Sequence, residues 1–412
     1  MHILAVNDDA SGGGAAHLYQ RTNAILRKGG HTVIELTGES LEAGANPTRA
    51  RWGVIRGIRH NIRHVYAPRL LRVIDQLLAA HRVDVAHVHN LHGRLTTQIM
   101  PFLKRRGVPV VYQVNDYYFF CNSYYAYNRR LDAPCRRCVG GQALWALRYG
   151  CVSYLGEPRY DKALLEWLRR LALQLARPWA AVDLFLVTSD QAGAILEEWG
   201  VPRTRQEKLL NPMCLDEFQD QEAPVLGDEI VFYGSCLPNK GAWTFLEALD
   251  DVEPETRLGV YLMGMTPDYE ARLRHIAARR HLRLRVDGTV RWSNGLRPIL
   301  ASARAIVVPS QWWVTSENIV YEGLLMGKPV ILGRIGGNME LVEHGETGFC
   351  FEPGNAKELA GYINCLAREP QLALRMGTEA WRRSRERFAE TVFLKRLEAA
   401  YERVRGRAEL DA

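Results

Sequence analysis

The chain of 412 residues is 47% hydrophobic and 24% charged, and it carries a formal net charge of +7. This composition is typical of a globular protein, and a chain of this length is expected to fold as two domains. No apolar run reaches the roughly 18 residues that span a bilayer. The N-terminus has no signal-peptide pattern, and no nucleic-acid motif accompanies the positive charge. We therefore expect a cytoplasmic protein with no nucleic acid among its partners.

The N-terminal segment is typical of a strand, a glycine-rich loop and a helix. We expect the strand at residues 2–6 and the helix to end near residue 27, with Gly13 and Gly14 in the loop between them. Glycine lets the backbone approach a ligand closely, and a helix N-terminus favours anions. The loop is a candidate contact for a phosphate or sugar, although both glycines could serve the turn alone.

Residues 49–72 are rich in arginine. Arg56, Arg59 and Arg63 are interleaved with isoleucines at a spacing that approximates a basic amphipathic helix. Such a helix binds anionic membranes, and a surface helix with its apolar face in the core has the same pattern, so both interpretations stay open. For a second apolar and basic stretch, residues 167–179, we expect a core helix.

Two predicted strands end in polar residues. Residues 83–87 lead into His89, Asn90 and His92, and residues 108–114 lead into Asn115 and Asp116. Ligands bind at the carboxyl ends of strands in open α/β sheets, so these side chains are candidates for a substrate site. We expect no metal at the histidines, because no carboxylate accompanies them in the sequence.

A cysteine-bearing excursion follows, with Cys121, Cys135, Cys138 and Cys151. Loops this long are uncommon unless they are functional or stapled. The four thiolates could bind a structural Zn²⁺ tetrahedrally, or they are free thiols in a loop on the acceptor side of the protein. In a cytoplasmic protein, disulfides are the less expected use.

After a hinge expected at residues 190–216, a second set of strands begins at 229–234. Ser235 and Lys240 follow this strand, and a lysine between a strand and a helix is a good phosphate ligand, although the alternative is an ordinary surface lysine. Later strands lead into Gly264 and into a loop with Thr289. These positions form a second candidate ligand edge.

Residues 306–351 form a predicted strand–loop–helix–strand unit. The helix begins near Glu317 and Asn318 and carries Glu322, and a glycine-rich turn at 333–338 leads into a further short helix. Both helix N-termini favour anions, because their backbone N–H groups have no partner within the helix. They suit a nucleotide diphosphate, and the carboxylate of Glu322 suits a ribose or sugar hydroxyl.

These residues carry a family resemblance. The runs Pro309-Ser310, Tyr321-Glu322-Gly323-Leu324 and Gly327-Lys328-Pro329-Val330 resemble the carboxyl-half signature of glycosyltransferase family 4. The resemblance implies the α/β GT-B fold, with two Rossmann-like β/α/β domains facing across a cleft and a C-terminal helix crossing back to the first domain. It implies an acceptor domain at 1–190, including the excursion at 117–155, a donor domain at 216–381 and the crossing helix at 382–412.

The resemblance also implies roles for the candidate residues. Catalysis is assigned to Asn115, Asp116 and Glu317, and the acceptor side includes His89 and Asn90. The donor is bound by Gly13, Gly14, Ser235, Lys240, Gly264, Thr289, Ser316, Asn318, Ile319 and Glu322. Members of the family need no metal for catalysis, so no cofactor is expected beyond a structural zinc at the four cysteines.

Three positions depart from the family pattern. Asn115 stands where a histidine is usual, Ser235 where an arginine is usual, and Val314 where the first of two glutamates is usual. Asparagine can hydrogen-bond a hydroxyl but cannot exchange a proton as imidazole does. Glu317 is either a displaced sugar ligand or a helix-start residue, where a carboxylate is stabilised.

We therefore predict a retaining glycosyltransferase that moves a sugar from a UDP- or GDP-linked donor to a glycan, a lipid-linked saccharide or another hydroxyl acceptor. We expect it to act in cell-surface polysaccharide biosynthesis, with peripheral binding to the anionic inner membrane face. The three departures suggest an alternative, a degenerate GT-B protein that binds a nucleotide-sugar or a partner without turnover. A third reading is an inverting transferase or a sugar epimerase.

Overall fold

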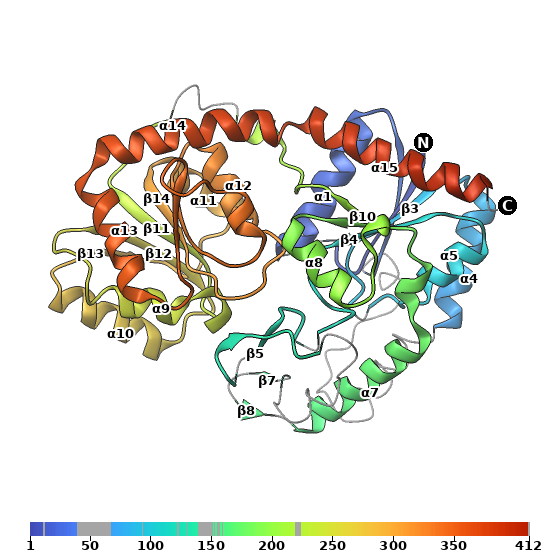
Figure 1. Cartoon of the computed structure of the whole chain (residues 1–412), viewed down its shortest axis with the longest axis horizontal. Helices are drawn as coiled ribbons and strands as arrows, with labels where there is room; N and C mark the ends of the chain where they lie inside the picture. Colours follow the sequence, from blue (N-terminus) through green and yellow to red (C-terminus); the bar gives the residue numbers. More distant parts are fainter. Residues whose placement is uncertain are drawn as a thin grey trace. The chain divides into compact units, whose positions relative to one another are not determined.

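The computed structural model describes residues 1–10, 13–38, 67–92, 94–121, 123–128, 130–138, 151, 153–154, 157–158, 160–218 and 224–410. The described chain divides into two compact units, and Figure 1 labels many of their helices and strands. Unit 1 comprises Met1–Arg130, Cys135–Pro212 and Glu390–Ala412, and unit 2 comprises Leu131–Pro134 and Met213–Ala389.

Unit 1 is built on a parallel sheet. In the described residues its strands are β1 (His2–Asn7), β2 (Thr32–Thr37), β3 (Val85–Val88), β4 (Val110–Val114), β9 (Leu184–Val187) and β10 (Gln206–Lys208). Their order is β10-β9-β4-β3-β1-β2, and each neighbouring pair is parallel. The central strands are short apolar runs with buried side chains, as expected for strands covered on both faces.

The helices of unit 1 include one that ends at Lys28, close to its predicted end near residue 27. They are α1 (Gly13–Lys28), α4 (Pro68–Ala80), α5 (Ile99–Arg105), α7 (Tyr160–Ala176), α8 (Asp190–Glu198) and α15 (Glu390–Leu410). The Ser189 hydroxyl accepts a hydrogen bond from the Ala192 N–H at 3.1 Å and so caps α8. Gly13 and Gly14 are the first residues of α1 rather than part of the preceding loop.

The C-terminal helix α15 packs within unit 1, which confirms that the end of the chain returns to the first domain. Lys28 Nζ lies 3.2 Å from Glu390 Oε2, and His31 Nε2 lies 2.8 Å from Glu398 Oε1. The helix predicted at 382–412 is divided in the structure. Residues 382–387 end α14 (Pro370–Arg387) of unit 2, and α15 starts afresh at Glu390.

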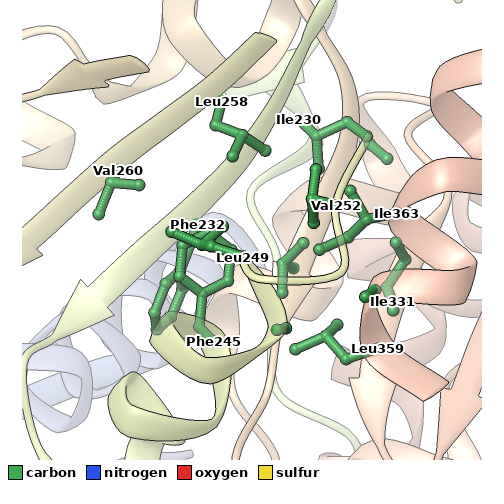
Figure 2. Close-up of a cluster of buried hydrophobic side chains, with 14 of the residues drawn as sticks. Ile230, Phe232, Phe245, Leu249, Val252, Leu258, Val260, Ile331, Leu359 and Ile363 are labelled. Carbon is green, nitrogen blue, oxygen red and sulfur yellow. The ribbon is translucent and has the colours of Figure 1, made fainter. Parts of the chain in front are cut away.

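Unit 2 has a second parallel sheet. Its described strands are β11 (Glu229–Ser235), β12 (Arg257–Met263), β13 (Arg283–Val286), β14 (Ala303–Val308), β15 (Val330–Gly333) and β16 (Gly348–Phe351), in the order β13-β12-β11-β14-β15-β16. The helices around it are α9 (Ala242–Ala248), α10 (Pro267–Arg279), α11 (Leu296–Ala301), α12 (Asn318–Leu325), α13 (Ala356–Arg368) and α14. Its core packs Phe232 of β11 and Val260 of β12 with Phe245 of α9 and Ile363 of α13 (Figure 2).

The strand order of each sheet places its candidate site. In unit 1 the chain runs from β1 outward to β2, then returns to the other side of β1 with β3 and β4. In unit 2 it runs from β11 through β12 to β13, then returns beside β11 with β14. Ligands of doubly wound sheets bind at the carboxyl ends of the strands where the direction of winding reverses. The loops after β1 and β3, and after β11 and β14, are therefore the candidate ligand edges.

Candidate active site

All predicted donor residues of the second half lie at one edge of the unit 2 sheet. Ser235 ends β11 and Lys240 follows it, Gly264 follows β12, and Thr289 follows β13. Ser316, Asn318, Ile319 and Glu322 follow β14. Parallel strands end at the same edge, so positions that are far apart in sequence come to one side of this unit.

Lys240 and Glu317 form an ion pair at this edge. The ammonium group of Lys240 donates to Glu317 Oε1 and lies 5.0 Å from the centre of the Trp312 ring. Ser310 Oγ and Asn338 Nδ2 donate to the other carboxylate oxygen at 2.8 and 2.7 Å. The Glu317 N–H in turn donates to Asn338 Oδ1 at 2.9 Å. Both oxygens of Glu317 are therefore engaged within unit 2.

The contacts of Glu317 keep it charged although it is buried. Burial alone raises the pKa of a carboxyl group, but Lys240, Ser310 and Asn338 outweigh it and hold the pKa of Glu317 below its ordinary value. Glu317 stands just before α12, and its side chain makes no capping hydrogen bond to that helix. Its observed role is thus to pair with Lys240 and tie Asn338 to the loop after β14.

Two glycines bring the loops of this edge together. Gly241, directly after Lys240, has φ +72°, and a Cβ there would lie 1.8 Å from the Pro309 carbonyl oxygen. Gly336 has φ +71°, and a Cβ there would lie 2.6 Å from the backbone of Val314. Only glycine allows both this backbone conformation and these close approaches.

Val314 is buried where the family pattern has its first glutamate. Its side chain is 2% exposed, and its carbonyl accepts from the Gly337 N–H at 2.7 Å. Because Gly336 approaches the backbone of Val314 closely, residue 314 is a tightly packed apolar position in this loop. The carboxylate nearest in sequence, Glu317, is held by Lys240 instead.

Glu322 is buried in α12 and lies near Tyr233 of β11. Burial, and then the charge of Glu322, raise the pKa of the Tyr233 hydroxyl. The nearby loop is fixed by Asp287, which accepts from both the backbone N–H and the hydroxyl of Thr289 at 2.7 Å. Gly264 has φ +71°, which explains the glycine at the end of β12.

The unit 1 edge brings together the predicted polar residues after β3 and β4. Asn115 Nδ2 donates to Asn90 Oδ1 at 2.9 Å, and the Asn90 N–H donates to Asn7 Oδ1 at 3.0 Å. Asp116 Oδ1 accepts from the Tyr118 N–H at 2.9 Å, and Asp116 Oδ2 lies 2.8 Å from His92 Nε2. The expectation that no carboxylate accompanies the histidines is therefore wrong for His92, because the folded chain supplies one.

His89, predicted on the acceptor side, is completely buried. Its ring stacks on His87 at 4.3 Å, and His87 Nδ1 is hydrogen-bonded to the Tyr401 hydroxyl at 2.7 Å. Burial lowers the pKa of both histidines, that of His87 to about 3, so both are neutral. His89 follows a strand covered on both faces, which explains why its ring lies in the interior of unit 1.

The four cysteines of the excursion form no disulfide, and Cys121, Cys135 and Cys138 lie within electrostatic range of Cys151. Burial, and then Cys121, Cys138 and Cys135, raise the pKa of the Cys151 thiol to about 12. Within the described part of the chain, no group of three or more His, Cys, Asp or Glu side chains is placed to hold a metal ion. The structural zinc at these cysteines stays a prediction.

Several residues that build these edges have no sequence signal. Trp312 and Asn338 complete the surroundings of Glu317 together with Ser310 of the signature run, and Arg169 contacts the tyrosines after Asp116. The Lys240 neighbour Asn239 is buried, and neither atom of its amide has a partner in the described chain. Spacing along the sequence could not have revealed these contacts, because each joins residues from separate elements.

Two Rossmann-like units, each with a polar edge at its winding reversal, and a C-terminal helix returned to the first unit define a GT-B glycosyltransferase fold. Residues 12–212 match a family model described as glycosyl transferase 4-like domain, and residues 227–369 match one described as glycosyl transferases group 1. The chain belongs to this family of glycosyltransferases, which confirms the resemblance seen in the sequence.

Individual relatives are distant. The chain is 22% identical over 234 residues to alpha-D-kanosaminyltransferase of Streptomyces kanamyceticus, a match covering 54% of this chain and 59% of the relative. It is 30% identical over 100 residues to spore coat protein SA of Bacillus subtilis, covering 24% of this chain and 26% of that protein. The matches therefore span less than two thirds of the length of these curated relatives.

Solved structures share the fold across nearly the whole chain. Sucrose-phosphate synthase of Thermosynechococcus elongatus has a TM-score of 0.66 at 15% identity, with 98% of each chain covered. Anabaena HepE, solved in complex with UDP, has a TM-score of 0.61 at 16% identity, covering 98% of this chain and 100% of HepE. At these identities the likeness establishes the fold alone.

Proposed function

We propose that the protein is a retaining glycosyltransferase that moves a sugar from a nucleotide-sugar donor to a hydroxyl acceptor. The observation that carries the proposal is the Lys240–Glu317–Asn338 cluster beside the start of α12, with Glu322 in the same helix. It combines a cation, helix N–H groups and a second carboxylate at a winding reversal, which suits a diphosphate and a ribose.

The donor is proposed to be UDP- or GDP-linked. Lys240 and the N–H groups of Asn318 and Ile319 would stabilise the departing diphosphate, and Glu322 would bind the ribose. Gly13 and Gly14, as the first turn of α1, would present further N–H groups to the donor or the acceptor. Anabaena HepE was solved with UDP-glucose, which supports a UDP-linked donor for this chain by analogy of fold.

The acceptor is proposed to be a glycan or lipid-linked saccharide in cell-surface polysaccharide biosynthesis. A fold neighbour, Staphylococcus aureus TarM, was solved with alpha-GlcNAc-glycerol and UDP, at a TM-score of 0.53 and 14% identity over 80% of this chain and 58% of TarM. Catalysis by this scheme needs no metal, because the charge on the leaving diphosphate is offset by protein groups.

The alternative is a protein that binds a nucleotide-sugar without turnover. It is favoured by the pairing of Glu317 with Lys240 and by the buried Val314, because neither position then offers a carboxylate to the sugar. Incubation with a panel of UDP- and GDP-sugars, monitored for free UDP or GDP, separates the two. Slow release by wild type supports a transferase, whereas a raised melting temperature without release supports the binder. A wild type that shows neither nucleotide release nor a raised melting temperature would overturn both the transferase and the binder.

Peripheral membrane binding is proposed for unit 1. No helix in the described residues is both long and apolar enough to cross a bilayer. Arg56, Arg59 and Arg63 lie outside the described residues, but α4 exposes Arg69 and Arg72. The expected core helix at 167–179 is buried on one face only: α7 buries Leu173 but exposes an aligned row of Leu168 (48%), Leu171 (37%) and Leu175 (78%).

Vesicle sedimentation tests this membrane binding. Apolar side chains beside basic ones suit an anionic membrane surface, where each basic residue contributes about 1 kcal/mol. We expect salt-sensitive binding to anionic vesicles, weakened by Arg56→Glu, Arg59→Glu and Arg63→Glu together and separately by Leu171→Glu with Leu175→Glu. If wild type stays in the supernatant at low salt, a soluble acceptor becomes the better proposal.

A further inference from the structure

His92 is held at the unit 1 edge by a carboxylate. Its Nε2 lies 2.8 Å from Asp116 Oδ2, and the two side chains are 33% and 12% exposed. The Nε2 atom itself is buried, and apart from this ion-pair contact it has no hydrogen-bond partner in the described chain. The exposed part of the imidazole is therefore the remainder of the ring, which carries Nδ1.

The ring of His92 is clamped by aromatic neighbours from the loop after β4. It stacks on Tyr124 at 5.4 Å with planes 8° apart, and it lies 4.8 Å from Tyr118. The Arg169 guanidinium lies 4.9 Å from the Tyr118 ring and donates to the Tyr124 hydroxyl at 3.1 Å. Tyr124 has φ +66°, a conformation that non-glycine residues seldom adopt outside sites fixed by their surroundings.

The charges around His92 favour a neutral ligand over an anion. Burial by itself lowers the pKa of His92, but the carboxylates of Asp116 and Asp8 outweigh burial and the opposing charge of Arg169, so the pKa is raised. Asp8 begins the neighbouring loop after β1, where its carboxylate accepts from the Arg94 and Leu95 N–H groups. Two carboxylates at this edge repel phosphate and leave the hydroxyls of a sugar as suitable partners.

We propose that His92, oriented by Asp116, is the imidazole that binds a sugar hydroxyl in the reaction proposed above. The Asp116 carboxylate beside Nε2 favours the tautomer with the proton on that nitrogen, so Nδ1 of the neutral ring accepts a hydrogen bond from the hydroxyl. Asn115 is held by the hydrogen bond from its Nδ2 to Asn90, and its amide, unlike the imidazole of His92, does not change protonation with pH. Asp116 acts as a positioning residue, and His92 is the group that touches the substrate.

Kinetics of variants test the proposal on whichever of UDP-glucose, UDP-N-acetylglucosamine or GDP-mannose the wild type turns over. His92→Gln is expected to lower kcat/KM about tenfold, the order of one hydrogen bond, while the Kd for UDP or GDP, which carry no sugar, changes less than threefold. Asp116→Asn keeps an oxygen acceptor for the Tyr118 N–H but lowers the pKa of His92. The acidic limb of its pH–rate profile should therefore move to lower pH. His275→Gln, at an exposed histidine of α10 in unit 2, is the matched control.

A measurement on the wild-type protein tests the role of His92 without depending on whether the variants fold. In protein labelled at the histidine Cε1 carbon, the His92 signal should titrate at a raised pH and shift when the turned-over donor is added. Unchanged turnover in His92→Gln, an unmoved pH limb in Asp116→Asn, or a donor that leaves the His92 signal unchanged would each overturn the role of His92 while the transferase stands. Absence of donor turnover in wild type overturns the proposed transferase function and this role with it.

Discussion

Removing Lys240 should cost unit 2 both stability and nucleotide affinity, and the two losses can be separated. Lys240 is 25% exposed and Glu317 10% exposed, so the pair is largely desolvated. Breaking a fully buried pair costs about 3–5 kcal/mol. Glu317 keeps its bonds to Ser310 and Asn338, and burial raises its pKa once the lysine is gone, so protonation limits the loss. We expect Lys240→Ala to cost about 2 kcal/mol, a fall of about 4–8 °C in Tm.

A double-mutant cycle isolates the ion pair from other effects of the substitution. Lys240→Ala, Glu317→Gln and the double variant are compared by urea unfolding, and we expect a coupling energy of about 1–2 kcal/mol at pH 7. Lys357→Ala, at an exposed lysine of α13, is the control and should be neutral. A coupling energy indistinguishable from zero would refute the reasoning from burial.

The pH dependence of the cycle gives a second check. The pKa of Glu317 is lowered in the folded protein from its ordinary value of 4.5. A lowered carboxyl pKa contributes stability that is fully present above the unfolded value and is lost as the pH falls through the folded value. The gap between wild type and Lys240→Ala should therefore narrow as the pH falls from 7, first as the buried Glu317 of the variant is protonated and then below 4.5 as wild type loses the ion pair. A gap that does not narrow contradicts the pairing.

The same variant tests the diphosphate role. A charged hydrogen bond to a ligand is worth about 1.5–3 kcal/mol, or roughly 10- to 100-fold in Kd. Calorimetric titration with UDP and GDP, at a temperature where Lys240→Ala is folded, should show a loss of this size. Wild-type affinity in a folded Lys240→Ala protein would leave Lys240 as a structural residue only.

Three further outcomes follow from the unit 2 edge and the cysteine excursion. Glu322→Ala should weaken UDP and UDP-sugars by the same factor in calorimetric titration, because the proposed contact is to the ribose; a loss confined to the sugar conjugates would contradict it. Gly241→Ala should destabilise unit 2 by more than about 2 kcal/mol in urea unfolding, because its Cβ would meet the Pro309 carbonyl at 1.8 Å, whereas Gly361→Ala, with open space around it in α13, should be neutral or stabilising. Cys151, with a pKa of about 12 against an ordinary 9.0, should react with iodoacetamide at pH 8 roughly 1,000-fold more slowly than an unperturbed thiol, as peptide mapping would show.

The fold could be predicted because it is encoded locally. Apolar β-branched runs such as Val110–Val114 and Ala303–Val308 are long enough for buried strands and too short for helices. Ser189 is a typical N-cap residue directly before α8, and glycines lie at the turns. The division of the C-terminal tail could not be read in this way, because the helical pattern continues on both sides of Phe388 and the break depends on which unit each half covers.

The state of Glu317 could not be predicted from its place in the motif. Its spacing from Glu322 suggested a displaced ligand or a helix-start residue, and both readings concern only its own helix. The partners that fix it come from the loop after β11 and from the turn that carries Asn338, which is 21 residues further along the chain. Such contacts are set by which strands are neighbours, and no local pattern reports that.

The pairing of His92 with Asp116 follows from strand register. β3 and β4 pair Ala86 with Val110 and Val88 with Tyr112, residues that are 24 apart in sequence, and the same offset separates His92 from Asp116. A slip of one residue would turn the side chains of one strand to the other face and bring a different residue opposite the histidine. The sequence shows both strands but not their register, so the histidines looked unaccompanied. The register relates Asn115 to His92. The end of β4 has an asparagine where the family pattern has a histidine, and the neighbouring loop after β3 carries an imidazole.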